Sequence, residues 1–523
     1  MNFRVLTLLA FALVSGCVAQ RRPSVASNEP HRPAYHFTPE KMWMNDPNGM
    51  VWYKGEYHLF YQYHPYSTVW GPMHWGHAVS RDLVQWQHLP VALYPDSLGM
   101  IFSGSAVIDW NNTSGLGDKN HPPMVAVFTQ HDIAGEKAGR QDFQTQGLAY
   151  STDRGRNWTK YAGNPVIPNP GIRDFRDPKV VRDEASDQWV LVLAAGDHVK
   201  LYGSKDLRKW QYLSDFGREW GAHGGVWECP DLFPMQVEGT GEKKWVLLQS
   251  LNPGAPNGGS GTQYFIGNFD GRRFTLDPVF AASLKKTGQA FWIDYGRDNY
   301  AGVTWSDIPA SDGRRIFLGW MSNWDYAQNV PTERWRSAMT LPRELSLKNT
   351  PTGLRLFTRP VRETERLRKR HVELPAQILN GTLDLTPRLN FSPSSCELLL
   401  EFEQPMDGVA DLAVVLSNAK GERYRVGYDC LKKEWYSDRR QAGDHAFSQA
   451  FAAQLHTAPH DPQVRTLQLH LFFDRASCEL FTDDGAVALT DIFFPTQDFD
   501  RLSIETRGGA VRLVKGAVWE LRP

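Results

Sequence analysis

A degenerate repeat in the first two thirds of the chain is the feature that most restricts its fold. Three ten-residue segments each combine the end of a strand, an acidic turn and a tryptophan that starts the next strand: HAVSRDLVQW at 77–86, AYSTDRGRNW at 149–158 and LYGSKDLRKW at 201–210. A weaker fourth copy, IGNFDGRRF, lies at 266–274. A recurring strand–turn–strand unit is typical of a β-propeller, whose blades are antiparallel four-stranded sheets.

Five other segments have the pattern of strand openings, roughly 50 to 75 residues apart, which leaves room for four strands each. They are NDPNG at 45–49, FSGSAV at 102–107, RDPKV at 176–180, ECPDLF at 228–233 and FWIDYG at 291–296. The sequence therefore predicts an all-β protein with a five-bladed propeller over residues 35–358. A β-sandwich of similar length is the structural alternative.

The chain has 523 residues, too many for one ordinary core, and two domains are expected. The segment RPVRETERLRKR at 359–370 is highly charged, so residues 359–371 are predicted to be a linker or short helix. After it, evenly spaced strand patterns such as CELLLEF and TLQLHLFF continue to the C-terminus. Residues 372–523 are therefore predicted to form a β-sandwich domain.

The N-terminus resembles an export signal. Arg4 precedes an apolar run at 5–14, which is too short to span a bilayer. The following LVSGC at 13–17 resembles a bacterial lipobox, in which Cys17 becomes the lipidated first residue of the mature protein. We therefore expect a lipoprotein signal over 1–17 and a flexible tether over 18–34. The alternative is an ordinary signal peptide with an incidental cysteine.

Overall charge excludes two classes of partner. There are 57 Lys and Arg residues against 58 Asp and Glu, a formal charge of −1. Such a chain has no global field for nucleic acid or for an anionic membrane, so membrane contact is expected only through the lipid anchor. The cysteines have neither CxxC nor Cys/His spacing, and no metal or organic cofactor is expected.

Three of the strand openings carry acids: Asp46, Asp177 and Glu228. Innermost propeller strands converge on a central channel, so these distant side chains are expected to meet at one mouth. Paired carboxylates are what glycoside cleavage requires, one to protonate the leaving oxygen and one to attack or to activate water. By itself WMNDPNG at 43–49 would be an ordinary polar turn. The acids of the outer repeat, Asp82, Asp153 and Asp206, are interpreted as turn formers.

The chain resembles glycoside hydrolase family 32, the β-fructofuranosidases, in three motifs that occur in the order WMNDPNG, FRDPK and WECPDLF. The resemblance extends over about residues 35–523 and includes LFYQYHP, WGPMHWGHAVS and FSGSAV. The family's fold is a five-bladed propeller followed by a β-sandwich. The resemblance implies that Asp46 is the nucleophile, Glu228 the general acid/base and Asp177 the transition-state stabiliser, with Arg176 orienting the acids. It also implies that the fructosyl site is lined by Trp43, Asn45, Gln62, Trp70, Phe102, Ser103, Arg176, Tyr295 and Trp320. Core packing is the alternative for Trp70 and Trp320, and a buried small apolar role is the alternative for Cys229.

Within the family, HWGHAVS, IFSGSAV and QGLAYS are more similar to exo-acting levanases and exo-inulinases than to phosphosucrose hydrolases. The expected activity is retaining, exo-acting release of terminal β-D-fructofuranosyl residues from levan or inulin, and from sucrose. A sucrose-preferring invertase and a fructosyltransferase are alternatives within the family. Outside it, an inverting arabinan or xylan hydrolase and a non-catalytic fructan-binding lipoprotein are the other readings.

Overall fold

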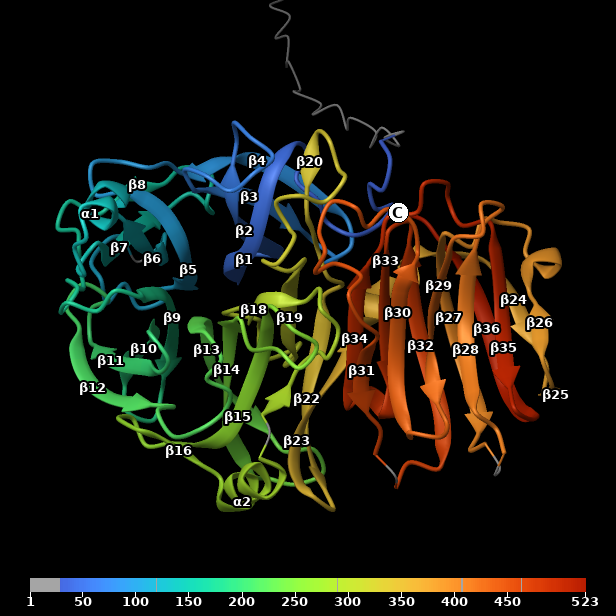
Figure 1. Cartoon of the computed structure of the whole chain (residues 1–523). Helices are drawn as coiled ribbons and strands as arrows, with labels where there is room; N and C mark the ends of the chain where they lie inside the picture. Colours follow the sequence, from blue (N-terminus) through green and yellow to red (C-terminus); the bar gives the residue numbers. More distant parts are fainter. Residues whose placement is uncertain (1–28, 119, 289, 406–407, 462) are drawn as a thin grey trace, which may run out of the picture.

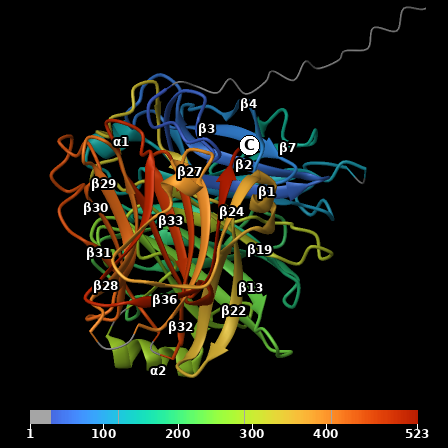
Figure 2. The ribbon, with the colours of Figure 1, turned by 90° about the vertical axis from the view of Figure 1, so that its right-hand side faces the viewer.

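The computed structural model describes residues 29–118, 120–288, 290–405, 408–461 and 463–523. Five mainly antiparallel sheets are arranged around a central axis, and two further sheets pack face to face beside them (Figure 1). The predicted propeller and sandwich are therefore confirmed. Figure 2 views the molecule from the sandwich side. No helix within these described ranges is long and apolar enough to cross a membrane, and Cys17 lies outside them.

The strands of each blade follow one another in the sequence from the axis to the rim. The first blade contains β1 (Met42–Tyr53), β2 (Glu56–His64), β3 (His74–Ser80) and β4 (Trp86–Leu93), with β20 (Trp335–Arg336) beside β1. The second contains β5 (Met100–Ile108), β6 (Met124–His131), β7 (Gln144–Ser151) and β8 (Thr159–Lys160), with helix α1 (Ile133–Lys137) after β6. The third contains β9 (Phe175–Asp183), β10 (Gln188–Ala195), β11 (Val199–Ser204) and β12 (Gln211–Phe216).

The last two blades carry additional short strands. The fourth contains β13 (Val226–Gln236), β14 (Lys243–Asn252), β15 (Gly261–Phe269) and β16 (Phe274–Leu276), with β17 (Phe291–Trp292) paired to β15 and helix α2 (Pro278–Thr287) between them in sequence. The fifth contains β18 (Tyr300–Thr304), β19 (Arg315–Met321), β22 (Arg343–Thr350) and β23 (Gly353–Pro360), with β21 (Ala338–Met339) paired to β19. The innermost strands β1, β5, β9, β13 and β18 contact one another in a closed ring.

One predicted strand opening is wrong. The fifth blade starts at Tyr300 and not in FWIDYG at 291–296, because Phe291 and Trp292 pair with Tyr264 and Gln263 and so extend the fourth blade. Aromatic residues and a nearby turn suit either position, and only the sheet partner distinguishes them.

The repeated outer turns share one set of hydrogen bonds. Their Ser–x–Asp pairs join Ser80 to Asp82, Ser151 to Asp153 and Ser204 to Asp206 at 3.2, 2.8 and 3.3 Å. Each aspartate also accepts from backbone N–H groups two to four residues later in the turn. The indole N–H groups of Trp86, Trp158 and Trp210 donate back to a turn carbonyl at 2.9–3.1 Å. Asp82, Asp153 and Asp206 are therefore turn formers, as predicted.

The sandwich follows the propeller directly. A 3₁₀ helix (Arg362–Leu367) comes after β23 and is followed at once by β24 (Arg368–Leu374), which pairs within the sandwich. The 3₁₀ helix and the start of β24 occupy the segment 359–371 that was predicted to be a linker or short helix. One sheet has the order β24, β36 (Val511–Leu521), β27 (Ser395–Glu403), β32 (Thr466–Asp474), β33 (Ser477–Thr482) and β34 (Val487–Ile492), with β25 (Gln377–Leu379) also on β36. The other has the order β26 (Thr382–Asp384), β35 (Arg501–Arg507), β28 (Asp411–Ser417), β29 (Arg423–Asp429), β30 (Glu434–Gln441) and β31 (His456–Pro459). Two more 3₁₀ turns lie at Thr386–Arg388 and Asp483–Gly485.

Buried ion pairs join the two domains. Arg343 of β22 donates to Asp294 at 2.7 Å and to Glu479 of β33 at 2.6 Å. The imidazole of His36 bridges Glu479 and Asp474 at 2.8 Å each. Buried charges of this kind are tolerated only with such complete pairing, so they fix how the domains sit.

Part of the predicted tether is held in place. Arg32 donates to Thr38 at 2.9 Å and lies over the ring of Trp335, and the Ala34 N–H donates to Asp474 at 2.6 Å. Residues 29–34 therefore lie against the folded domains, because their polar groups find partners on both of them.

Candidate active site

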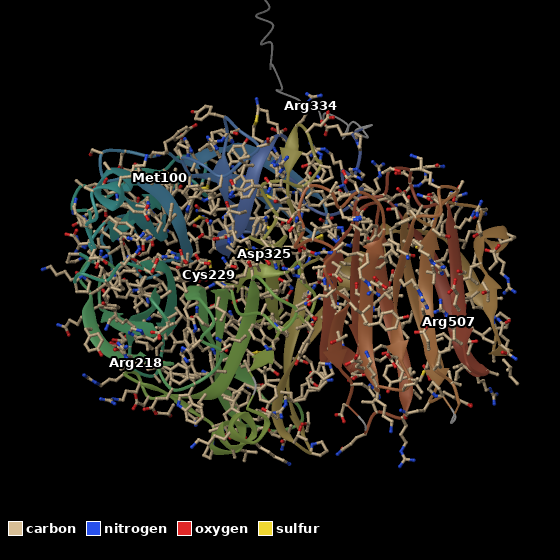
Figure 3. All side chains as sticks on the ribbon, viewed as in Figure 1. Met100, Arg218, Cys229, Asp325, Arg334 and Arg507 are labelled. Carbon is tan, nitrogen blue, oxygen red and sulfur yellow. The ribbon has the colours of Figure 1, made fainter. Side chains whose placement is uncertain are left out.

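The three predicted acids lie on three of the five innermost strands, at the end of the ring where those strands begin. Asp46 is on β1, Asp177 on β9 and Glu228 on β13. Ser103 on β5 and Tyr300 on β18 complete the ring at the same level. Figure 3 labels Cys229, which follows Glu228, near the middle of the propeller.

All five innermost strands carry the same irregularity at this level. In each, three residues advance against two on the neighbouring strand, which is the pattern of a β-bulge. The register shifts fall between Met44 and Pro47, Ile101 and Gly104, Arg176 and Lys179, Glu228 and Asp231, and Tyr300 and Val303. Asp177 and Cys229 have positive φ angles of 65° and 47°. Because bulges re-aim side chains, the repeated bulge explains why acids so far apart in sequence converge.

Asp46 is held by two polar donors. Ser103 donates its hydroxyl to Oδ2 at 2.8 Å, and the Asn45 amide donates to Oδ1 at 3.0 Å. The indole N–H of Trp43 donates to Asn45 Oδ1 at 2.7 Å, which fixes the orientation of that amide. Asp46 is thus oriented on both oxygens.

Asp177 and Asp46 share a neighbour in Cys229. The Cys229 N–H donates to Asp177 Oδ2 at 3.0 Å, and the Cys229 sulfur lies 3.6 Å from that oxygen and 3.5 Å from Asp46 Oδ2. The backbone N–H of Asp177 donates to the Thr129 hydroxyl at 2.9 Å. The bulges of the third and fourth blades are therefore tied together through one carboxylate.

Glu228 receives donors from both neighbouring blades. Arg176 Nη2 donates to Oε1 at 2.9 Å, and the Tyr300 hydroxyl donates to Oε2. Arg176 is fixed in turn by Asp174, which its Nη1 approaches at 2.6 Å. About a fifth of the Glu228 side chain remains exposed, so this carboxyl still faces solvent.

Burial and mutual repulsion change the acidity of the group. Burial, and then the charge of Glu228, raise the pKa of Asp46. Burial also raises the pKa of Asp177, to about 7, with Glu228 and Asp46 adding to the rise and Arg176 opposing it. Burial opposes the charge of Arg176, but Glu228, Asp177 and Asp174 raise the pKa of Arg176 above its ordinary value, so its guanidinium stays charged. Strongly perturbed carboxyls of this kind are typical of catalytic centres.

The ring is filled immediately below the acids. Lys179 Nζ donates to the Thr304 carbonyl at 2.6 Å and lies 3.3 Å from Asp231 Oδ2. Asp231 also accepts from the Thr304 N–H and hydroxyl at 2.6 and 2.8 Å. All three residues are buried. These contacts tie β9, β13 and β18 together, so the acids open to solvent on one side only.

The predicted sugar-contacting residues divide into three groups. Asn45, Ser103 and Arg176 touch the acids directly. Trp70 and Phe102 are half-buried beside them, with ring centroids 6.1 Å apart, and Gln62 is buried with an amide nitrogen that has no hydrogen-bond partner. Trp43 and Trp320 are fully buried and pack at 6.0 Å behind the acids, so core packing, the alternative reading for Trp320, describes its position.

Tyr295 lies apart from this group. Its N–H donates to the Ala488 carbonyl of the sandwich at 2.8 Å, and its side chain packs against the cores of the fourth blade and of the sandwich. The tyrosine that reaches the acids is Tyr300. It was missed because the fifth opening was assigned to FWIDYG; the usable signal was the short glycine-containing run YAGVT at 300–304, which resembles FSGSAV.

Within the part of the chain that the structure describes, no cluster of three or more His, Cys, Asp or Glu side chains could hold a metal ion. What the centre offers is three carboxyls, one guanidinium and one phenol.

Residues 36–360 match the family model described as "Glycosyl hydrolases family 32 N-terminal domain", and residues 363–520 match "Glycosyl hydrolases family 32 C terminal". The chain is 47% identical over 522 residues to the levanase of Bacillus subtilis (strain 168), covering 98% of this chain and 73% of the levanase. It is 38% identical over 510 residues to an extracellular exo-inulinase of Aspergillus niger, covering 93% and 94% of the two chains.

Solved structures agree with these relatives. The exo-inulinase from Aspergillus awamori superposes with a TM-score of 0.84 at 35% identity, covering 94% of this chain and 99% of that one. The β-fructofuranosidase from Schwanniomyces occidentalis, complexed with fructosyl-erythritol, also gives 0.84, at 32% identity and with 96% and 99% coverage.

Proposed function

Because the chain belongs to glycosyl hydrolase family 32, we propose that it is a retaining exo-fructosidase that removes terminal β-D-fructofuranosyl units from levan or inulin, and from sucrose. The observation that carries the proposal is the meeting of Asp46, Asp177 and Glu228 at one level of the ring, each with its own hydrogen-bond donors. The relatives named levanase and exo-inulinase support fructans as the substrate class.

In the proposed first step, the Asp46 carboxylate attacks the anomeric carbon of the terminal fructose. Glu228 gives its proton to the glycosidic oxygen, the bond between that oxygen and the anomeric carbon breaks, and the shortened chain leaves. The product is a fructosyl ester of Asp46. Ser103 and Asn45 hold Asp46 in the attacking position.

In the second step, Glu228 takes a proton from water, the water oxygen bonds to the anomeric carbon, and the ester bond to Asp46 breaks. Two inversions give net retention. Arg176 and the Tyr300 hydroxyl orient Glu228 for both steps. Asp177 is proposed to bind ring hydroxyls through bonds that strengthen at the transition state.

The filled ring supports exo action. Lys179, Asp231 and Thr304 are buried directly beneath the acids, so substrate reaches them from one side. A chain end fits such an approach better than the middle of a polymer. A sugar in place of water in the second step would give the fructosyltransferase alternative, and strong preference for sucrose would give the invertase alternative.

The test is one digest with four substrates: levan, inulin, sucrose and an arabinan. We expect fructose from the first three and nothing from the arabinan, and ¹H NMR of the first product should show the β-anomer before mutarotation. The proposal would be overturned if only the arabinan were hydrolysed, or if the α-anomer of fructose appeared before the β-anomer. Binding of levan without any turnover would favour the non-catalytic alternative.

The protein is exported, as its similarity to an extracellular exo-inulinase and to a bacterial levanase supports. We further propose that Cys17 of LVSGC is lipidated and anchors the enzyme to a membrane.

A further inference from the structure

Exposed apolar side chains gather at the catalytic end of the first two blades. Of the ten large hydrophobic residues exposed among the described residues, five lie in the connecting segments at this end: Tyr66, Val69, Tyr94, Leu98 and Ile133, the last at the start of α1. These segments follow β2, β4 and β6, whose ends lie beside the starts of β1, β3 and β5 respectively. The other five are scattered, no two of them in one loop. A concentration of this kind marks a surface that binds something.

The centre of the patch is a row of three rings. Tyr66 and His74 meet edge to face at 5.7 Å and 78°, and His74 and Tyr94 meet at 5.5 Å and 81°. Tyr66 is 72% exposed and Tyr94 52% exposed, whereas His74 is buried between them. Burial lowers the pKa of His74, and its Nδ1–H donates to the Pro72 carbonyl at 2.8 Å, so the middle ring is neutral and fixed.

Hydrogen bonds from neighbouring strands hold the loops that carry the two tyrosines. Lys160 Nζ donates to the Tyr94 carbonyl and to Asp96 Oδ2 at 2.5 Å each. The Ser67 carbonyl accepts from the Trp43 N–H at 2.9 Å, and His64 Nδ1 donates to the Val69 carbonyl at 2.9 Å. Rings held in this way lose little conformational freedom when a ligand binds them.

The patch is continuous with the catalytic centre. The loop that carries Tyr66 also carries Trp70, whose ring packs against Phe102 at 6.1 Å. Phe102 immediately precedes Ser103, which donates to Asp46. The loop after β2 therefore connects Tyr66 to the acids, and the ring of His74 connects Tyr66 to Tyr94.

We propose that Tyr66 and Tyr94 form a subsite for the part of a fructan chain that lies beyond the cleaved bond. The inference rests on the proposed function and adds a binding surface outside the centre. Furanose rings present C–H faces that pack on exposed aromatic rings, and the two phenol groups can bond to sugar hydroxyls. The three rings of the row, Tyr66, His74 and Tyr94, carry no charge, which suits an uncharged ligand such as a sugar. Sucrose has a single sugar ring beyond the cleaved bond, whereas a fructan chain has many, so we expect the row to matter for polymers and not for sucrose.

The test compares Tyr66→Ala/Tyr94→Ala with the wild type on long-chain levan, long-chain inulin and sucrose. For whichever polymer the subsite binds, levan or inulin, KM of the double alanine variant should rise about three- to tenfold. This is the effect expected from losing one or two aromatic contacts. The kcat on that polymer and both constants on sucrose should stay unchanged. Tyr66→Phe/Tyr94→Phe should retain most polymer affinity, since the rings remain. Tyr212→Ala removes a similarly exposed tyrosine (54%) from outer strand β12 and should change nothing.

A second readout is independent of turnover. Asp46→Asn protein should be retarded in a native gel that contains levan or inulin, and the added tyrosine-to-alanine changes should abolish the retardation. Unchanged polymer KM and unchanged retardation would overturn the subsite while leaving the proposed function intact. Equal losses on sucrose and polymer would also overturn it, since they indicate damage to the centre. Absence of fructose release from every fructan and from sucrose by the wild type would instead refute the proposed function.

Discussion

The Tyr300 hydroxyl donates a hydrogen bond to Glu228 Oε2, and this bond joins the innermost strand of the fifth blade to that of the fourth. Arg176 holds the other oxygen from the third blade. Glu228 is therefore fixed from both sides of the ring, which is what an acid that must serve two successive proton transfers requires.

Tyr300→Phe should lower kcat on sucrose by about 10- to 100-fold with little change in KM. The reason is that a hydrogen bond to a charged group is worth roughly 1.5–3 kcal/mol. Tyr424→Phe is the matched control, because it removes a buried hydroxyl that bonds Ser437 at 2.8 Å within the sandwich. A kcat for Tyr300→Phe equal to that of the control would show that the contact has no catalytic role.

Asp46→Asn should retain the fold and lower turnover on every substrate by about three orders of magnitude or more, since an amide cannot form the fructosyl ester. Thermal unfolding monitored by circular dichroism checks the fold, and fructose release checks turnover. Glu228→Gln separates the two roles. It should recover part of its first step on a fructoside whose leaving group needs no proton, and Asp46→Asn should not.

Near wild-type turnover by Asp46→Asn would move the nucleophile elsewhere. If Asp46→Asn and Glu228→Gln recovered turnover equally on the activated fructoside, the assignment of Asp46 as nucleophile and Glu228 as acid would be wrong.

The positions of the three acids in the sequence were predictable, whereas the residues and strand irregularities that hold them were not. WMNDPNG, FRDPK and WECPDLF identify Asp46, Asp177 and Glu228 because the chemistry is concentrated in short segments. Tyr300 was missed since its strand is five residues long and no acid marks it. The shared bulge depends on pairing between strands, which no single segment reports. The ion pairs of Arg343 with Asp294 and Glu479 join residues up to 136 positions apart, and local patterns say nothing of them.

The propeller was predictable for a different reason. The Ser–x–Asp turns repeat their own hydrogen bonds in three blades, so the local sequence carries the local structure. The fourth-to-fifth blade boundary lacks such a turn, and there the prediction failed.

Asp177→Asn should gain stability relative to the wild type as pH rises. The folded-state pKa of Asp177, about 7, lies above the ordinary aspartate value of about 3.9. Between those values the folded wild type holds a proton that the unfolded chain has lost, so wild-type stability falls as pH increases. The difference approaches at most about 4 kcal/mol above pH 7 and vanishes near pH 4.

Urea unfolding of both proteins at pH 4.5, 6 and 8 checks this. A stability difference that is independent of pH, or that favours the wild type more at pH 8, would contradict the raised pKa.

Cys17→Ser should release the enzyme from the membrane fraction without changing its specific activity, because Cys17 precedes the residues 36–360 that contain all three acids. Fractionation of the producing cells and mass spectrometry of the N-terminal peptide are the measurements. A wild type that is entirely soluble and carries no acyl mass on Cys17 would rule out the lipid anchor.

The most direct measurement of the central claim is chromatography of levan and inulin digests within the first few per cent of hydrolysis. Because the ring is filled below the acids, we expect free fructose as the first product, with polymer size falling slowly while reducing sugar rises. A ladder of short oligosaccharides that appears before fructose accumulates would mean internal cleavage and would contradict exo action.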